Sequence, residues 1–166
     1  VRFTYLHPSH HFPYLGNDAS CVLRIEGPHG AALLTGDIGD VVERTLVRRD
    51  APSLAADVVV VPHHGSEGAS DPAFIRATGA RVALVASGAN NRFGHPRAEV
   101  VERWCRAGAR VLDTAAGGAL RVDVGAEGVK TAARRETHAR LWDATPRSAR
   151  GAGLCYRPND GPGPEE

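Results

Sequence analysis

The sequence lacks methionine altogether, and its 166 residues begin at Val1. A complete translation product normally opens with methionine, so we interpret the sequence as a fragment whose missing part lies upstream. The sequence also lacks a long apolar run. Its longest apolar stretch falls well short of the roughly 18 residues that a membrane-spanning helix needs. The N-terminal residues have no long apolar core, so no signal peptide is predicted.

Cysteine is scarce, and its spacing is uninformative. Cys21, Cys105 and Cys155 have no metal-ligand spacing, and because their number is odd we predict that they are unpaired and do not indicate a compartment. The net charge of +1 argues neither for nor against an acidic partner. The length and a hydrophobic fraction of 42% predict one globular domain with a true core.

Apolar periodicity predicts an α/β layered sheet, in which a hairpin is followed by alternating strands and helices. The predicted strands are 3–6, 21–26, 31–35, 57–61, 81–86, 110–112 and 119–124, and the predicted helices are 39–49, 70–78 and 97–107. The pattern weakens near residue 125. We therefore predict a domain over 1–124, and over 125–166 a basic extension with a disordered C-terminal end.

Three groups of polar residues follow apolar strands. Asp37 comes after the strand 31–35, His63 and His64 come after the run 58–61, and His95 lies in the loop after residue 86. Ligands gather at the carboxyl ends of strands in open α/β sheets, so these side chains are predicted to converge there. One carboxylate and several imidazoles would suit Zn²⁺ or Mn²⁺, and a carboxylate can bridge two such ions. If the strand continued through His63 and His64, at most one of them would face the site.

Each of these residues also has a purely structural interpretation. Asp37 after a glycine could form a turn or cap a helix, and His95 before a proline could start a helix. Other polar residues near the three groups are candidates for supporting roles. Asn17 and Ser20 could lie behind the ligands or shape a turn; Asn90, Asn91 and Arg92 could bind a phosphate or satisfy loop backbone; Ser66 is a further candidate for substrate binding.

Several motifs occur in a specific order along residues 15–124. They are Asn-Asp-Ala-Ser-Cys at 17–21, Thr-Gly-Asp at 35–37, Pro-His-His-Gly-Ser at 62–66, Asn-Asn-Arg-Phe-Gly-His-Pro at 90–96 and Thr-Ala-Ala-Gly-Gly-Ala at 114–119. In this combination the sequence resembles the C-terminal half of the metallo-β-lactamase-like domain of the ComEC family of DNA-internalisation competence proteins. The resemblance implies the second half of an αββα sandwich.

The resemblance also implies roles for individual residues. Asp37 matches the bridging carboxylate of the superfamily, and His63 or His64, together with His95, match its later metal-binding histidines. Asp37 and His64 are the residues for which a catalytic role is implied. Asn17 stands where many members carry a further metal-binding histidine. The superfamily's first ligand motif, His-x-(His/Asp)-x-Asp-His, occurs nowhere in this sequence.

The implied function is natural transformation. In the complete protein this domain would be a nuclease that hydrolyses DNA phosphodiesters with one or two Zn²⁺ or Mn²⁺ ions, whereas this chain alone is expected to be inactive. The implied partners are DNA, membrane-channel segments upstream in the same polypeptide, and other competence proteins. The implied location is the outer face of the inner membrane.

Two alternatives remain open. The chain could be a soluble metallo-β-lactamase-fold hydrolase of a small molecule. It could also be a non-catalytic DNA-binding module whose basic segment, residues 130–157, contacts phosphates; binding of that kind would depend strongly on salt.

Overall fold

A mixed six-stranded sheet forms the centre of the molecule. The computed structural model describes residues 1–9, 16–138 and 153–155. The strands are β1 (Arg2–His7), β2 (Val22–Gly27), β3 (Gly30–Leu34), β4 (Val58–Val60), β5 (Val82–Val85) and β6 (Arg110–Asp113), and they lie side by side in chain order. β1, β2 and β3 are antiparallel, whereas β3 to β6 run parallel to one another. The carboxyl ends of β3, β4 and β5 therefore lie at one edge of the sheet.

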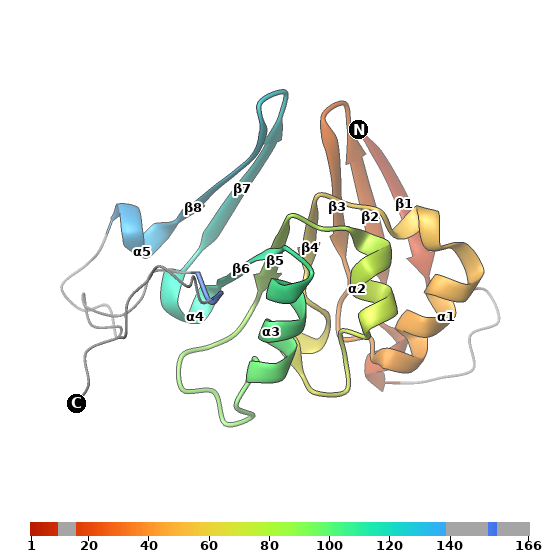
Figure 1. Cartoon of the computed structure of the whole chain (residues 1–166), viewed down its shortest axis with the longest axis horizontal. Coiled ribbons are helices and arrows are strands. Elements are labelled where there is room, and N and C mark those ends of the chain that lie inside the picture. The colour runs from red at the N-terminus through yellow and green to blue at the C-terminus, as the bar shows by residue number, and fades with distance from the viewer. Residues whose placement is uncertain (10–15, 139–152, 156–166) are drawn as a thin grey trace.

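Three helices cover one face of this sheet. α1 (Asp40–Asp50), α2 (Pro72–Thr78) and α3 (Ala98–Arg106) lie in a row along it (Figure 1). The main core cluster joins their apolar residues, among them Leu46, Phe74 and Trp104, to alternate residues of β3 to β6. Local signals explain the bounds of α2: the Asp71 side chain accepts the Ala73 N–H, Pro72 occupies the first position, and Gly79 ends the helix in a left-handed conformation.

A two-stranded sheet covers part of the opposite face. β7 (Leu120–Gly125) and β8 (Gly128–Ala133) form an antiparallel hairpin, flanked by the short helices α4 (Thr114–Gly117) and α5 (Arg134–Thr137). Val122 and Val124 pack with Val58, Val82 and Leu112 in a second apolar cluster. In Figure 1 the hairpin stands on the β6 side of the sheet, away from β1 and β2.

The hairpin leaves an apolar surface on the same face of the sheet. The β-ladder aligns Phe3 with Ile25 and Tyr5 with Leu23, and the latter two pair in turn with Ala32 and Leu34 of β3. Phe3 is 63% exposed and Tyr5 is 70% exposed. The β1–β3 half of this face is therefore continuous with the buried cluster beneath the hairpin, but the described residues leave it largely open to solvent.

Two expectations about the C-terminal part need correction. Cys105 and Cys155 form a disulfide, and only Cys21 is a free thiol among the described residues, so the prediction of three unpaired cysteines was wrong. Strand β8 lies beyond residue 124, where the sequence predicted the domain to end, and Ala133 is buried in the core. The packed structure thus crosses that boundary, because β8 pairs along its whole length with β7. The predicted disordered end, residues 159–166, lies outside the described residues.

In the described part of the chain, no helix is long and apolar enough to cross a membrane. Each predicted helix is present, and each predicted strand has an observed counterpart whose ends differ by at most one residue.

Candidate functional site

The candidate site lies at the carboxyl ends of β3, β4 and β5. Asp37 follows β3, and its Oδ1 lies 3.4 Å from Nε2 of His64, which follows β4. His64 Nδ1 lies 2.7 Å from the carbonyl oxygen of Ala86, just after β5. A carbonyl can only accept, so His64 carries a proton on Nδ1 and turns Nε2 toward the carboxylate. Both side chains are partly open to solvent, at 39% for Asp37 and 49% for His64.

The two adjacent histidines lie in a turn rather than on a strand. β4 ends at Val60, and residues Pro62–Gly65 form a 3-10 turn in which His63 and His64 have φ angles of 49° and 56°. These left-handed conformations are costly for residues other than glycine. Two hydrogen bonds tie the turn to the end of β3: the Thr35 hydroxyl donates to Val60 O at 2.7 Å, and His63 N–H donates to Gly36 O at 3.1 Å.

Both histidines consequently lie at the same edge of the sheet. The strand alternation that would have sent one of them to the other face does not apply. His63 Nε2 lies 3.1 Å from the Asn17 side-chain nitrogen, and its ring centroid is 6.1 Å from that of His95. Asn17, His63 and His95 thus form a second group beside Asp37 and His64.

Short polar contacts hold the segments that carry Asn17 and Asp37. The Asp18 side chain accepts the Gly39 N–H at 2.9 Å, and the Ser20 hydroxyl accepts the Asp37 N–H at 3.1 Å. Gly36 permits this approach, since its φ is 57° and an added Cβ would lie 2.6 Å from Ser20 Cβ. Ser20 therefore lies behind Asp37, and Asn17 lies beside His63, at the positions where the sequence predicted supporting roles.

The loop that bears His95 is closed on itself by Asn91. Its side chain donates to His95 O at 2.6 Å and accepts the His95 N–H at 3.0 Å. The rings of Phe93 and His95 stack with centroids 5.9 Å apart, and the Arg92 guanidinium covers Phe93. Of the two interpretations for Asn91, loop stabilisation matches these contacts.

The other predicted substrate-binding residues are open to solvent to differing degrees. Asn90 and Arg92 are exposed, and Ser66 is half-buried with its N–H donated to His63 O. They lie on the loops that surround the histidines, and their contacts with other described residues do not identify a ligand.

The surroundings of His95 lower its pKa and so favour the neutral imidazole. Partial burial, followed by the nearby charges of Arg97, His63 and His64, lowers the pKa of His95 below its usual value. Its Nδ1 atom is buried and has no hydrogen-bond partner among the described residues. A neutral imidazole with a free nitrogen is the form that can bind a metal ion.

The described residues nevertheless do not form a complete metal site. No group of three or more His, Cys, Asp or Glu side chains in the described part of the chain is arranged to hold an ion. Instead, the donors fall into two neighbouring pairs, Asp37 with His64 and His63 with His95. The residues of this chain alone therefore do not fit a Zn²⁺ or Mn²⁺ centre, which needs at least three protein ligands in the usual zinc site.

A polar cluster that the sequence did not single out adjoins the site. The Ser87 hydroxyl donates to Asp113 at 2.6 Å, and the Ser87 N–H donates to the Thr114 hydroxyl oxygen at 2.9 Å. Asp113 is buried at the carboxyl end of β6 and caps α4 through Ala115 N–H. The sequence contained a pattern that could have predicted this cluster, since an acidic residue, Asp113, follows the apolar run 111–112. This cluster fixes the end of β5 next to the carbonyl that orients His64.

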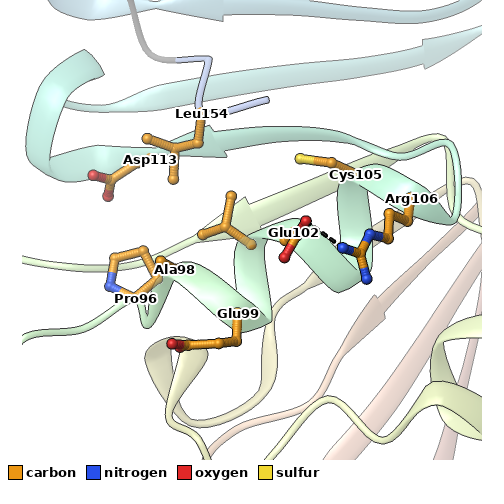
Figure 2. A pocket seen from close by; sticks show the side chains of 9 residues that line it. Pro96, Ala98, Glu99, Glu102, Cys105, Arg106, Asp113 and Leu154 are labelled. Carbon is orange, nitrogen blue, oxygen red and sulfur yellow. Dashed lines mark hydrogen bonds and ion pairs between the residues drawn. The ribbon is translucent and has the colours of Figure 1, made fainter. Parts of the chain in front are cut away.

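A pocket of about 840 Å³ lies beside the site, between α3 and β6 (Figure 2). It begins at Pro96, next to His95, and extends along α3 to Cys105 and Leu154. Among the described residues, its charged lining consists of Glu99, Glu102 and Asp113 with one cation, Arg106, which is paired with Glu102. Because three carboxylates line the pocket, it would repel a phosphate backbone, so we do not assign DNA to it.

Known proteins resemble this chain over most of its length. It is 35% identical to "Competence protein ComA" of Neisseria gonorrhoeae over 146 residues, which are 88% of this chain and 21% of that protein. It is 34% identical to "ComE operon protein 3" of Bacillus subtilis (strain 168) over 120 residues, 72% of this chain and 15% of the relative. It is 31% identical to "Uncharacterized protein YcaI" of Escherichia coli (strain K12) over 127 residues, which are 76% of this chain and 17% of that protein.

The chain is thus related to a competence-related family of proteins. It spans between 15% and 21% of the length of these relatives, so the similarity concerns one segment of each. No family model matches the sequence, and no solved structure matches it significantly.

Proposed function

We propose that this chain contributes half of a divalent-metal centre to a DNA-uptake protein, and that the complete centre hydrolyses phosphodiesters. The observation that carries the proposal is the contact between Asp37 and His64. With Nδ1 donating to Ala86 O, His64 Nε2 faces a carboxylate oxygen of Asp37 at 3.4 Å. A proton or a cation between these two atoms makes the contact favourable. Zn²⁺ or Mn²⁺ is the cation class that imidazole and carboxylate favour together.

The chain's own residues would orient and hold such an ion. Ala86 O fixes the His64 ring, Ser20 holds the Asp37 backbone, and the lowered pKa of His95 keeps that ring neutral. A bound divalent ion would lower the pKa of water and neutralise charge on phosphoryl oxygens. Since the described residues supply only two donor pairs, the remaining ligands would come from outside them.

The uncovered sheet face supports the idea that further structure completes the domain. Phe3, Tyr5 and Leu34 form an apolar surface that continues the core beneath β7–β8. A surface of this kind usually marks an interaction site. Additional strands laid beside the hairpin would cover it and would give the αββα arrangement that the motifs imply.

The disulfide supports a location outside the cytoplasm. Disulfides persist in oxidising compartments and are rare in the cytosol, and Cys105–Cys155 links two segments 50 residues apart. This agrees with the proposed placement on the outer face of the inner membrane, beside a membrane channel that would belong to the rest of the protein. Other competence proteins are proposed partners.

The proposed function predicts a loss of transformation when His64 is removed. The matched segment of the gonococcal relative would be exchanged for this chain, and transformation frequency measured with His64→Ala. We expect at least about a ten-fold decrease, since disturbing even the groups behind a metal ligand costs about that much. The matched control is His29→Ala, an exposed histidine in the turn between β2 and β3. An unchanged frequency in His64→Ala would overturn the proposal.

The half-site also predicts that the isolated chain is inactive. The purified 166-residue chain should not cleave DNA in the presence of Mn²⁺ or Zn²⁺, because its described residues hold too few ligands. Efficient cleavage that disappears in Asp37→Asn would show that the ligand set is already complete, contrary to the proposal. Hydrolysis of small esters or lactams without an effect on transformation would instead favour the small-molecule hydrolase.

A binding module without catalysis is less well supported by the contacts. Among the described basic residues of 130–157, Lys130 pairs with Glu127, and Arg135 donates to the Ala115 carbonyl. Residues 139–152 and 156–157 lie outside the described residues. If the domain only bound DNA, Asp37→Ala would leave transformation intact.

A further inference from the structure

Glu43 is a fully buried carboxylate outside the candidate site. It lies on α1, and its exposed fraction is 0%. Oε1 accepts the Ser70 N–H at 2.7 Å and Oε2 accepts the Asp71 N–H at 2.6 Å. A buried carboxylate needs such partners because desolvation of its charge is costly. Both partners belong to the segment 66–71, which joins the His63–His64 turn to α2.

Other contacts from α1 and α3 converge on the same segment. Gly68 O accepts the Asp40 N–H from α1 at 2.9 Å. From α3, Trp104 Nε1–H donates to the Ser70 hydroxyl at 3.0 Å and Arg103 donates to Ser70 O at 2.8 Å. Ser70 itself has a φ of 64°, a conformation that surrounding contacts must impose. Glu43 and Arg103 supply the charged hydrogen bonds among these contacts, and charge-assisted bonds are about twice as strong as neutral ones.

The segment 66–71 connects directly to the histidine turn. Ser66 N–H donates to His63 O at 2.9 Å, and Ala69 N–H donates to Ser66 O at 3.2 Å. The helix that carries Glu43, α1, begins three residues after Asp37. Glu43 therefore links the helix that follows Asp37 to the segment that follows His64.

We propose that Glu43 is a positioning residue, whose ionised carboxylate holds the segment 66–71 on α1 and thereby sets the alignment of His64 with Asp37. This inference rests on the proposed function for the meaning of that alignment, but its physical content is independent of metal and DNA. The carboxylate accepts both bonds at full strength. In a protonated Glu43 one oxygen carries the proton and is a weaker acceptor, so that one of the two bonds is weakened.

Burial of Glu43 brings the pKa of its carboxyl into the physiological range. Burial raises the pKa of Glu43 to about 7, the backbone bonds from Asp71 and Ser70 oppose that rise, and the carboxylates of Asp71 and Asp40 reinforce it. Arg44 of α1 pairs with both Asp40 and Asp71. Arg103 of α3 lies on the far side of Ser70. The two hydrogen bonds that Glu43 accepts from Ser70 and Asp71 are therefore at full strength above about pH 7, and one of them weakens as the pH falls below that value.

The effect on stability has the opposite direction. The folded-state pKa lies above the ordinary value of 4.5, so the folded chain binds this proton more tightly than the unfolded chain. The contribution of Glu43 to stability is complete below about pH 4.5 and is lost as the pH rises through about 7. The ionised form of Glu43, which holds the segment 66–71 and aligns the site, is thus less stable than the protonated form, and strongly shifted pKa values of this kind are common at functional sites.

The test is an NMR titration of the whole 166-residue chain. The Ser70 and Asp71 amide proton shifts are expected to titrate together with a midpoint near pH 7, because both N–H groups donate to the Glu43 carboxylate. In Glu43→Gln both titrations should vanish, whereas Glu99→Gln, a change at an exposed position of α3, should leave them intact. Shifts that stay flat in the wild-type chain, or that persist in Glu43→Gln, would overturn the proposal.

A second readout tests positioning at the site itself. The His63 N–H donates to Gly36 O, and this bond joins the segment that carries His64 to the segment that carries Asp37. At pH 8, exchange of this amide should be about ten-fold faster in Glu43→Gln than in the wild type, the effect of losing one bond to a charged group. An unchanged rate would show that Glu43 only stabilises the segment 66–71, and would overturn the positioning role. Neither readout uses metal or DNA, so their failure is distinct from a failure of the transformation assay.

Discussion

Reduction of the Cys105–Cys155 disulfide is expected to lower the free energy of unfolding by about 4 kcal/mol, the value for a closed loop of 50 residues. The bridge constrains the unfolded chain, and in the folded chain it holds residues 153–155 against β6. There, Leu154 N–H donates to Val111 O at 2.9 Å, and Gly153 forms a bridge with Leu112. Chemical denaturation with and without dithiothreitol measures the difference.

The cysteine variants separate the disulfide from other thiol effects. Cys155→Ser should be as unstable without reductant as the wild type is with it. Cys21→Ser removes the free, exposed cysteine and should retain the full sensitivity to dithiothreitol. If the wild-type chain unfolds at the same denaturant concentration with and without reductant, the bridge does not contribute to stability, and the argument for an oxidising compartment loses its support.

Gly65→Ala is expected to destabilise the chain by about 3 kcal/mol, from about 1 kcal/mol for a positive φ angle and about 2 kcal/mol for overpacking. Gly65 has a φ of 80°, and an added Cβ would lie 2.6 Å from Pro96 Cβ. This glycine ends the histidine turn, and its carbonyl accepts the Arg97 N–H at 2.9 Å. Relief of the clash would move the His95 loop away from His63.

The matched control for this prediction is Gly68→Ala. Gly68 lies three residues further along the chain, its φ is outside the left-handed region, and an added Cβ would meet nothing within 4 Å. Urea denaturation should therefore show only a small change for Gly68→Ala. Equal stabilities for the two variants would contradict the close packing of the histidine turn against Pro96.

The strand pattern of the sequence predicted that the candidate residues lie at one edge of the sheet. Asp37, His63, His64 and His95 each follow an apolar strand of one parallel set, and such strands end at a common edge. The supporting residues Asn17 and Ser20 also lie there, in contact with His63 and Asp37. Asn91 is different: its side chain closes its own loop, a contact between residues four apart that composition does not distinguish from phosphate binding.

The sequence by itself determined the main helices and strands up to about residue 124, because apolar periodicity, a capping aspartate and a terminating glycine act over a few neighbouring residues. Only the tertiary structure decided which distant groups meet. It turned both histidines toward one edge through a left-handed turn, paired Cys105 with Cys155, and packed β8 onto β7. It also buried Glu43 beneath the segment 66–71, where desolvation and two backbone donors, rather than its position in the sequence, set its pKa.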